Sequence, residues 1–270
     1  MFDSAHPTLK ARIASGECLG VAWLSFGSVA LVETAARSRP DAIVIDLQHG
    51  LWERRDLEAA IGVVRPEVPV IVRVAENSAL AIGTALDAGA EGVMVPMIES
   101  AEQAHHALQW SRYPPQGRRS GGGVRPLQDF PAYLQGAADI AVIVMIETAA
   151  GLAKADAIAR VRGLDMVFVG TGDLGLSLQV AGSDPRHAQA CARIKRACDK
   201  ASLPCGLFTG TLAAAQQHRA LGYRMAVVAN DLDVVARGFA AASDAFRSTV
   251  HTAPLTKPAA RARKPSVRAA

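Results

Sequence analysis

The sequence has few aromatic residues, few cysteines and no apolar run of membrane-spanning length. Aromatic side chains make up 5% of the 270 residues, and the four cysteines include no CxxC pair and no histidine at zinc-site spacing. These absences exclude a disulfide scaffold and a cysteine-rich zinc module. The N-terminus also lacks the apolar segment of a signal peptide, so we expect a reduced, cytoplasmic setting and no membrane partner.

Acidic residues are missing from the last twenty positions. Residues 251–270 hold five basic side chains and no acidic one, which leaves 24 basic against 25 acidic residues in 1–250. The net charge of +4 therefore belongs to this basic tail, whose Ala, Pro, Lys and Arg composition predicts disorder. Since the body carries no excess of positive charge, we expect no nucleic-acid partner. Residues 1–250 show no linker-like change in composition and predict a single domain.

Short apolar runs recur along the body at the spacing of βα units. They show little alternation, as is typical of strands buried on both faces. Amphipathic, alanine-rich segments predict helices between them, including 56–64, 79–88, 101–110 and 184–201, and 231–246 follows the last run. Eight strands, each followed by a helix, predict an α/β fold of the (β/α)8 TIM-barrel type, with a doubly wound open sheet as the alternative. The eight runs are 18–24, 41–45, 69–74, 92–96, 140–146, 165–169, 204–208 and 224–229.

The longest irregular stretch is 113–130, which is rich in Pro, Gly and Arg. A loop of that length inside a compact domain is usually functional.

Polar residues at the ends of the predicted strands form the candidate site, because barrel enzymes place their chemistry at the carboxyl ends of the strands. Two carboxylates on successive strand ends suit a hard divalent cation such as Mg²⁺ or Mn²⁺. Either acid alone has another reading, since acidic residues also cap the helices that follow strands. The candidates at strand ends are Asp46, Gln48, His49, Arg73, Glu147 and Asp173.

A general base and a fixed cation are also present in this set. His49 is suited to proton transfer near neutral pH, with Asp46 holding its ring, although a loop histidine without a role fits the pattern equally well. Arg73 ends an apolar strand, so it must meet an anion or reach water, and a substrate carboxylate is one such anion. Among the other histidines, we expect His187 to face the surface.

A literal GxGxxG match, Gly170-Thr-Gly172-Asp-Leu-Gly175, follows the sixth run. Asp173 would place a negative charge where a pyrophosphate sits, and no acid ends a strand about twenty residues later. We therefore expect no nicotinamide cofactor. The same glycines can instead expose backbone N–H groups to a small carboxylate beside the metal.

Taken in order, these pieces resemble the class II, metal-dependent pyruvate aldolases of the HpcH/HpaI aldolase/citrate lyase family. The resemblance covers about residues 20–238 and rests on the order and spacing of several short segments. These are Asp41-Ala-Ile-Val-Ile-Asp-Leu-Gln-His-Gly50, Val72-Arg73, Ala85-Leu-Asp-Ala-Gly-Ala90, Gly92-Val-Met-Val-Pro-Met97, Arg112-Tyr-Pro-Pro-Gln-Gly-Arg-Arg-Ser120, Ile146-Glu-Thr148 and Phe168-Val-Gly-Thr-Gly-Asp-Leu174.

The resemblance implies a (β/α)8 barrel whose C-terminal helix is exchanged between subunits, in hexamers built from dimers. It also implies aldol addition of pyruvate to an aldehyde, or cleavage of a 4-hydroxy-2-oxoacid. By position, Glu147 and Asp173 match the ligands of Mg²⁺ or Mn²⁺, with Co²⁺ as a further candidate. Arg73 matches the residue that steadies pyruvate and its enolate. His49 with Asp46 matches the acid/base pair, and the backbone around Gly172 and Asp173 matches the seat of the pyruvate carboxylate.

The sequence also departs from this family at two candidate positions. Gln48 stands where many members carry Glu, and Met145 stands two residues before Glu147, where some branches carry Gln. No lysine ends a predicted strand, which argues against a Schiff-base aldolase. Two alternatives stay open: an oxaloacetate decarboxylase that uses the same metal-held enolate, and an anion- or RNA-binding oligomeric scaffold that binds through the tail.

Overall fold

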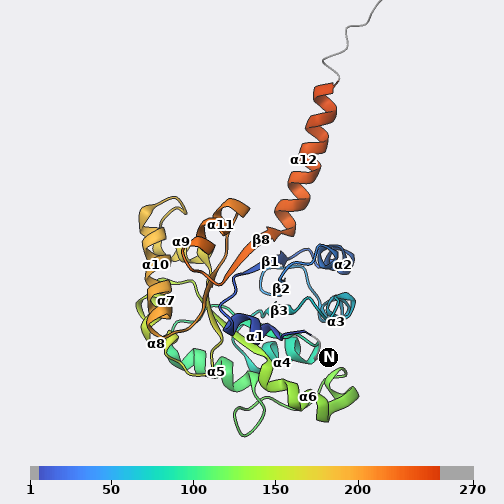
Figure 1. The fold of residues 1–270 in the computed structure, drawn as a ribbon, viewed down its shortest axis with the longest axis vertical. Helices are drawn as coiled ribbons and strands as arrows, with labels where there is room; N and C mark the ends of the chain where they lie inside the picture. The colour runs from blue at the N-terminus through green and yellow to red at the C-terminus, as the bar shows by residue number, and fades with distance from the viewer. Residues whose placement is uncertain (1–5, 250–270) are drawn as a thin grey trace, which may run out of the picture. The chain divides into compact units, whose positions relative to one another are not determined.

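Eight parallel strands pair in chain order and close into a barrel in the computed structural model, which describes residues 6–249 (Figure 1). The first strand also pairs with the eighth, so the (β/α)8 prediction is confirmed and the open-sheet alternative is wrong. Every predicted run overlaps one of these strands, and β2 and β8 each extend one residue beyond the predicted run. They are β1 (Leu19–Leu24), β2 (Ala42–Asp46), β3 (Val70–Arg73), β4 (Gly92–Val95), β5 (Ala141–Ile146), β6 (Met166–Val169), β7 (Cys205–Leu207) and β8 (Met225–Asn230).

Helices connect the strands and surround the barrel (Figure 1). Most of them begin at a Ser, Thr or Asp whose side chain accepts a backbone N–H of the first turn, as at Ser28, Ser78 and Thr211. The helices are α1 (Leu9–Ala14), α2 (Val29–Arg37), α3 (Arg54–Val63), α4 (Ala79–Asp87), α5 (Ala101–Ser111), η1 (Pro126–Asp129), α6 (Phe130–Gly136), η2 (Ala137–Asp139), α7 (Ala149–Ala153), α8 (Ala155–Ala159), α9 (Thr171–Leu178), α10 (Pro185–Lys200), α11 (Leu212–Ala220) and α12 (Asp231–Thr249).

The strands bury both faces, except in the second half of β8 where Val228 is exposed, and this explains the lack of alternation in the sequence. One face contributes to a cluster inside the barrel, with Val44, Ile71, Met145 and Phe168 among its members. The other face packs against the surrounding helices in a larger cluster. Met145 is 1% exposed in the interior cluster, so this departure from the family pattern fills the barrel core.

The short helix α1 covers the amino end of the barrel, and the sequence patterns did not predict it. Leu9 and Ile13 are buried together with side chains of the barrel interior. The fit is close at Gly92, where an added Cβ would lie 2.8 Å from Leu9 Cδ2. Glycine at the start of β4 therefore leaves room for the helix.

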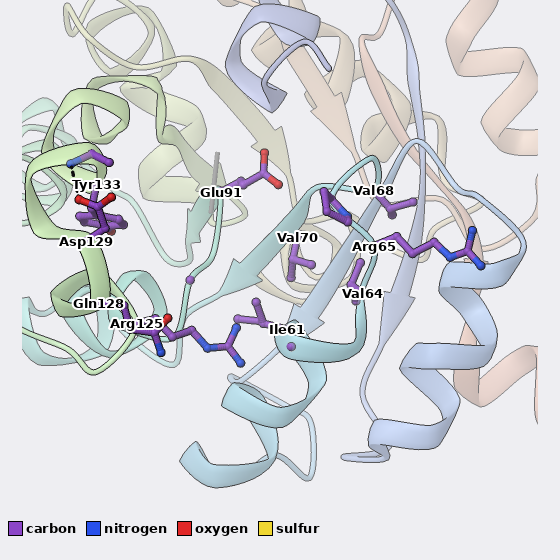
Figure 2. A pocket seen from close by; sticks show the side chains of 14 residues that line it. Ile61, Val64, Arg65, Val68, Val70, Glu91, Arg125, Gln128, Asp129 and Tyr133 are labelled. Atoms are coloured by element: carbon purple, nitrogen blue, oxygen red, sulfur yellow. Dashed lines mark hydrogen bonds between the residues drawn. The ribbon is translucent and has the colours of Figure 1, made fainter. Parts of the chain in front are cut away.

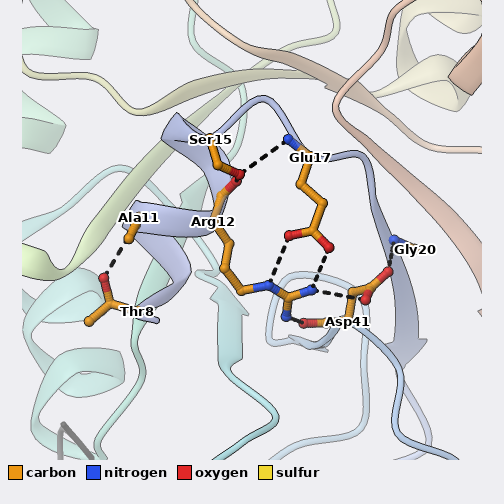
Figure 3. A network of polar contacts seen from close by, with 7 residues as sticks. All are labelled: Thr8, Ala11, Arg12, Ser15, Glu17, Gly20 and Asp41. Atoms are coloured by element: carbon orange, nitrogen blue, oxygen red, sulfur yellow. Dashed lines mark hydrogen bonds and ion pairs between the residues drawn. The ribbon is translucent and has the colours of Figure 1, made fainter. Parts of the chain in front are cut away.

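An arginine of α1 joins this helix to the starts of β1 and β2 (Figure 3). Arg12 donates to the backbone oxygen of Asp41 at 2.6 Å and forms an ion pair with the Asp41 carboxylate at 2.9 Å. The second oxygen of that carboxylate accepts the Gly20 N–H at 2.8 Å, and Glu17 lies 3.4 Å from Arg12. Because these groups are only partly exposed, the network holds α1 in place better than a surface ion pair does.

The long segment 113–130 lies at the amino end of the barrel, away from the carboxyl ends of the strands. It leads from α5 toward β5, and connections that enter a strand meet the barrel at its amino face. Arg119 anchors this segment: its guanidinium pairs with Asp87 at 2.9 Å and lies over the rings of Tyr113 and Tyr133 at 4.7 and 5.3 Å. Arg119 is 4% exposed, so its role here is to pack the segment against α4.

The chain divides into two units, one ending at Asp233 and the other beginning at Val234. The predicted domain end at 250 and the basic tail, 251–270, lie outside the described residues. Exchange of the C-terminal helix between subunits stays a prediction. Within residues 6–249, no helix is both long and apolar enough to cross a membrane.

Candidate active site

Three of the predicted site residues face the barrel interior because side chains alternate along a strand. Asp46, Arg73 and Glu147 each stand two positions after an interior residue, namely Val44, Ile71 and Met145. The same face that fills the barrel with apolar side chains therefore presents polar ones at its carboxyl rim. All three are buried, at 2%, 7% and 1% exposure.

Asp46 and Arg73 form a two-pronged ion pair on neighbouring strands. Arg73 Nε donates to Asp46 Oδ1 at 2.7 Å, and Nη2 donates to Oδ2 at 2.5 Å. Trp23 Nε1 and Ser25 Oγ donate to the same Oδ2 at 3.3 and 3.4 Å. Burial raises the pKa of Asp46, but the bonds and charge of Arg73 outweigh burial and hold that pKa below its ordinary value. The pair is therefore ionised and fixed in orientation.

The guanidinium of Arg73 lies over the ring of Trp23, which contacts two further aromatic rings. Its central carbon is 4.9 Å from the centre of the Trp23 ring. Trp23 meets Phe208 edge to face at 5.2 Å and stacks on Phe168 at 6.0 Å. The hydrogen bonds of the described residues use Nε and Nη2, which leaves Nη1 of Arg73 as an available donor.

Glu147 has one satisfied oxygen and one orphaned oxygen. Oε1 accepts the backbone N–H of Met97 at 2.7 Å, whereas Oε2 is buried without a hydrogen-bond partner. Met97 has φ 57°, a left-handed conformation that costs a residue other than glycine energy and is held here by its surroundings. Burial raises the pKa of Glu147; the Met97 N–H and Arg73 oppose this, and Asp173 adds to it.

The buried oxygen of Glu147 that has no hydrogen-bond partner is suited to bind a cation. The charges that act on Glu147 include Arg73, Asp173 and Asp46, so the structure brings the predicted residues into one electrostatic environment. No cluster of three or more His, Cys, Asp or Glu suited to a metal occurs in residues 6–249. Glu147 and Asp173 alone would supply one oxygen each. This fits Mg²⁺ or Mn²⁺, which keep water and substrate oxygens in the remaining positions.

Gly170 makes room for the orphaned oxygen. A Cβ at this position would lie 2.0 Å from Glu147 Oε2, so only glycine fits beside the carboxylate as it stands. Gly170 caps α9, and Gly172 and Asp173 lie in the first turn of this helix. The N–H groups of a first turn have no partner within the helix, so they are available to an anion.

His49 lies in the turn after β2 and is exposed. Its backbone N–H, and not its ring, donates to Asp46 Oδ1, at 3.3 Å. Within residues 6–249 the Asp46 carboxylate is engaged by Arg73, Trp23, Ser25 and the turn, and no hydrogen bond joins it to the imidazole. The structure thus brings Asp46 to Arg73 rather than to the ring of His49.

Gln48 donates its backbone N–H to Asp46 Oδ1 at 3.0 Å. Its side-chain Oε1 is buried and has no partner in the described part of the chain. The side-chain amide of Gln48 can both accept a hydrogen bond from a bound molecule and donate one, whereas a glutamate at this position could only accept unless it were protonated.

Sequence reasoning missed the residues that support the rim. Trp23 lies near the end of β1, and Asp231 follows β8. The carboxylate of Asp231 accepts the N–H groups of Ser25 and Phe26 at 2.8 and 2.9 Å. Asp231 is 5% exposed. A signal for both was available, since Trp23 lies in the first predicted run and Asp231 directly follows the last strand, but Asp231 matched a helix start equally well.

Comparison with known proteins gives the family. The family model for HpcH/HpaI aldolase/citrate lyase matches residues 20–238. The chain belongs to this family. The resemblance inferred from the motifs is confirmed, and the enzyme class is that of an aldolase or lyase.

Individual relatives agree with this assignment. A hydroxypyruvate/pyruvate aldolase of Paraburkholderia phytofirmans is 38% identical over 244 residues, covering 83% of this chain and 91% of the relative. A 4-hydroxy-2-oxovalerate aldolase of Rhodococcus jostii is 31% identical, covering 93% of this chain and all of the relative. The crystal structure of a family protein from Burkholderia cenocepacia superimposes with a TM-score of 0.84 at 34% identity, covering 88% and 98% of the two chains.

Proposed function

We propose that this HpcH/HpaI family member is a divalent-metal-dependent aldolase that joins pyruvate to an aldehyde, or cleaves a 4-hydroxy-2-oxoacid into the same products. The observation that carries the proposal is the orphaned Oε2 of Glu147, buried beside Arg73 and Asp173 at the carboxyl rim. The names of the relatives, pyruvate and 4-hydroxy-2-oxovalerate aldolases, support the substrate class.

Glu147 and Asp173 would hold Mg²⁺ or Mn²⁺, with Co²⁺ as a third candidate. Such an ion acts as a Lewis acid toward the keto and carboxylate oxygens of pyruvate. The orphaned oxygen of Glu147 and the space left by Gly170 fit that role.

The chain's own residues account for binding and charge stabilisation. The first-turn N–H groups of Gly172 and Asp173 would bind the pyruvate carboxylate at the start of α9. Arg73 would donate from Nη1 to the keto oxygen, where negative charge develops as the methyl proton leaves. Asp46 holds Arg73 in that orientation through two hydrogen bonds, so no reorganisation is needed at the moment of reaction.

His49 would transfer the proton, and the aromatic rings of Trp23 and Phe208 would keep water away from the site. His49 is exposed at the rim, so it can exchange protons with the solvent while it takes a proton from the substrate or returns one to the aldehyde oxygen, directly or through a water. Trp23 and Phe208 would provide an apolar surface beside Arg73. A drier site strengthens the interaction between Arg73 and the developing charge.

Two further proposals concern the assembly and its surroundings. We infer a homohexamer built from dimers that exchange the C-terminal helix, which the exposed Val234 and Phe239 of α12 support. A cytoplasmic setting is supported by the four free cysteines at 18, 191, 198 and 205.

The test is an aldol assay. Pyruvate, glycolaldehyde and Mg²⁺ or Mn²⁺ should yield a 2-oxoacid adduct, and a chelator should abolish its formation. The double variant Glu147→Ala, Asp173→Ala should lose this activity; unchanged turnover would overturn the metal assignment. A parallel reaction with oxaloacetate distinguishes a decarboxylase, because release of CO₂ far faster than aldol turnover would replace the proposed reaction with that one.

A further inference from the structure

A cavity of about 630 Å³ lies at the amino end of the barrel, away from Glu147. It is bounded by α1, the end of α5, η2 and the loop that leads into β6, all of which meet the barrel where strands begin. Its volume lies in the range of pockets for small organic ligands. The proposed aldolase reaction makes no use of it.

The charged side chains that line this cavity are all basic. Lys10, Arg112 and Arg162 line the cavity together with His105, and none of the described residues that line it is Asp or Glu. Arg162 is exposed and forms no ion pair within residues 6–249, so its charge is available to a ligand. A concave surface with cations only attracts small anions.

The neighbouring acids compensate this charge only in part. Asp165 lies behind the lining: its Oδ2 accepts the Val142 N–H at 2.7 Å. The same carboxylate is 3.4 Å from Lys10 Nζ and 3.8 Å from Arg112 Nη2, so one negative charge serves two cations. Asp139 also acts on Arg112, but it is exposed and its effect is screened by solvent.

Arg112 is the most buried of the three cations, with 15% of its side chain exposed. Its Nη2 donates to the backbone oxygen of Ile140 at 2.9 Å, whereas Nη1 is buried without a partner. The positive charge of Arg112 is therefore only partly neutralised, because one of its donors is unused and the Asp165 carboxylate is 3.8 Å away. An anion bound against Arg112 would supply the missing charge.

We propose that this cavity binds a phosphorylated small molecule, whose phosphate meets Lys10, Arg112 and Arg162. A phosphate dianion presents several acceptor oxygens, and cations on separate elements can contact it from different sides. The amides of Gln109 and Gln116 offer neutral donors for the rest of the ligand, and Leu108 and Leu134 offer apolar contact. The site is thus a second binding site, distinct from the catalytic rim.

A neighbouring cavity of similar size shows that arginines at this end do not by themselves make an anion site. It has a volume of about 680 Å³ and contains Arg65 and Arg125, but also Glu91 and Asp129. Figure 2 shows Arg65 extending away from Arg125, toward the neighbouring helices. Because acidic side chains lie among the arginines of this second cavity, it is not lined by cations alone, and Arg65 provides a matched control.

The experiment is calorimetric titration of the full chain with AMP, with citrate as the carboxylate alternative. Lys10 and Arg162 are changed together to alanine, because both side chains reach the surface. Arg112→Lys serves as a second variant that keeps the buried charge. Arg65→Ala is the control at the same end of the barrel, and Glu147→Ala is the control at the rim.

We expect saturable AMP binding with one site per chain. The Lys10→Ala, Arg162→Ala double variant should weaken it at least fivefold, Arg112→Lys should weaken it as well, and both controls should stay within twofold of the unchanged chain. Absence of saturable binding, or less than a fivefold loss in the double variant, would overturn the site. Loss in either control would overturn its location, and tighter binding of citrate than of AMP would overturn the phosphate class.

Discussion

Replacing Gly170 by alanine tests the role of Glu147 with a single methyl group. The backbone at Gly170 has φ −81° and ψ 91°, which alanine adopts without left-handed strain. The added carbon would lie 2.0 Å from Glu147 Oε2 and 2.8 Å from the Cβ of Glu147. Because a carbon and an oxygen in contact need about 3.3 Å, Oε2 must retreat by more than about 1 Å.

Such a displacement affects metal binding, and the close contact with Glu147 Cβ also lowers the free energy of unfolding, by about 1–3 kcal/mol. Oε2 is the oxygen that we assign to the cation, and a shift of about 1 Å at a reacting centre costs on the order of a hundredfold in rate. We therefore expect Gly170→Ala to bind Mn²⁺ about 10- to 100-fold more weakly. The aldol kcat/KM at a fixed Mn²⁺ concentration should fall by about two orders of magnitude.

The matched control is Gly210→Ala, because Gly210 also follows a barrel strand and a Cβ there meets nothing within 4 Å. Mn²⁺ affinity is measured by electron paramagnetic resonance of the free ion, and turnover by formation of the 2-oxoacid. Circular dichroism confirms that both variants fold. If Gly170→Ala binds Mn²⁺ and turns over within threefold of Gly210→Ala, Glu147 Oε2 is not a ligand and the reasoning fails.

Three other changes probe the barrel and its rim. Burial raises the pKa of Glu91 to about 7, so its carboxylate destabilises the fold increasingly as the pH rises from near 4.5 to 7. Glu91→Gln should therefore raise the free energy of unfolding at pH 8 by up to about 3 kcal/mol and leave it unchanged at pH 4. Urea melts at fixed protein concentration measure both values. Arg73→Lys loses the two-pronged ion pair with Asp46, so we expect kcat to fall on the order of 100- to 1,000-fold. An unchanged kcat would show that Arg73 has no part in the mechanism. Gly206→Ala would place a Cβ 2.8 Å from Met225 Cβ and should lower the free energy of unfolding by about 1–3 kcal/mol. Gly83 lies on α4 where a Cβ meets nothing within 4 Å, so Gly83→Ala should raise the free energy of unfolding by about 1 kcal/mol. Equal effects of the two variants would refute the packing argument.

The barrel was predictable because its strands are buried on both faces. Runs such as 140–146 contain no polar residue, and this pattern has few solutions other than a parallel sheet covered by helices. The rim was predictable for the same reason: the first polar residue at an inward position after such a run must reach the carboxyl end. Asp46, Arg73 and Glu147 all follow this rule.

What the sequence could not predict depends on contacts between distant segments. Helix α1 is six residues long, too short for its periodicity to show that Leu9 and Ile13 close the barrel. His187 was expected at the surface, and this was wrong: it is 8% exposed, and its Nε2 lies 2.8 Å from the backbone oxygen of Thr171. The burial of a helical histidine depends on which helix packs against it, and here α9 does.

The predicted partnership of Asp46 and His49 shows a second limit. Three residues of separation bring the two close, and the backbone N–H of His49 does reach the carboxylate. The ring competes for that carboxylate with Arg73, a permanent cation one strand away, and a two-pronged bond to a guanidinium is stronger than a single bond to a neutral imidazole. The imidazole of His49 therefore does not have Asp46 as its hydrogen-bond partner.

The GxGxxG match illustrates how different constraints produce one sequence pattern. In a dinucleotide site the glycines serve a phosphate, but here each has a separate cause. Gly170 leaves room for a carboxylate of the neighbouring strand, and an added Cβ at Gly175 would crowd the backbone oxygen of Val180 at 3.1 Å. Gly172 faces open space, where a bound molecule can approach the N-terminus of α9. A glycine pattern thus becomes informative once the atom that excludes a Cβ at each position is known, and at Gly170 that atom is the oxygen assigned to the metal.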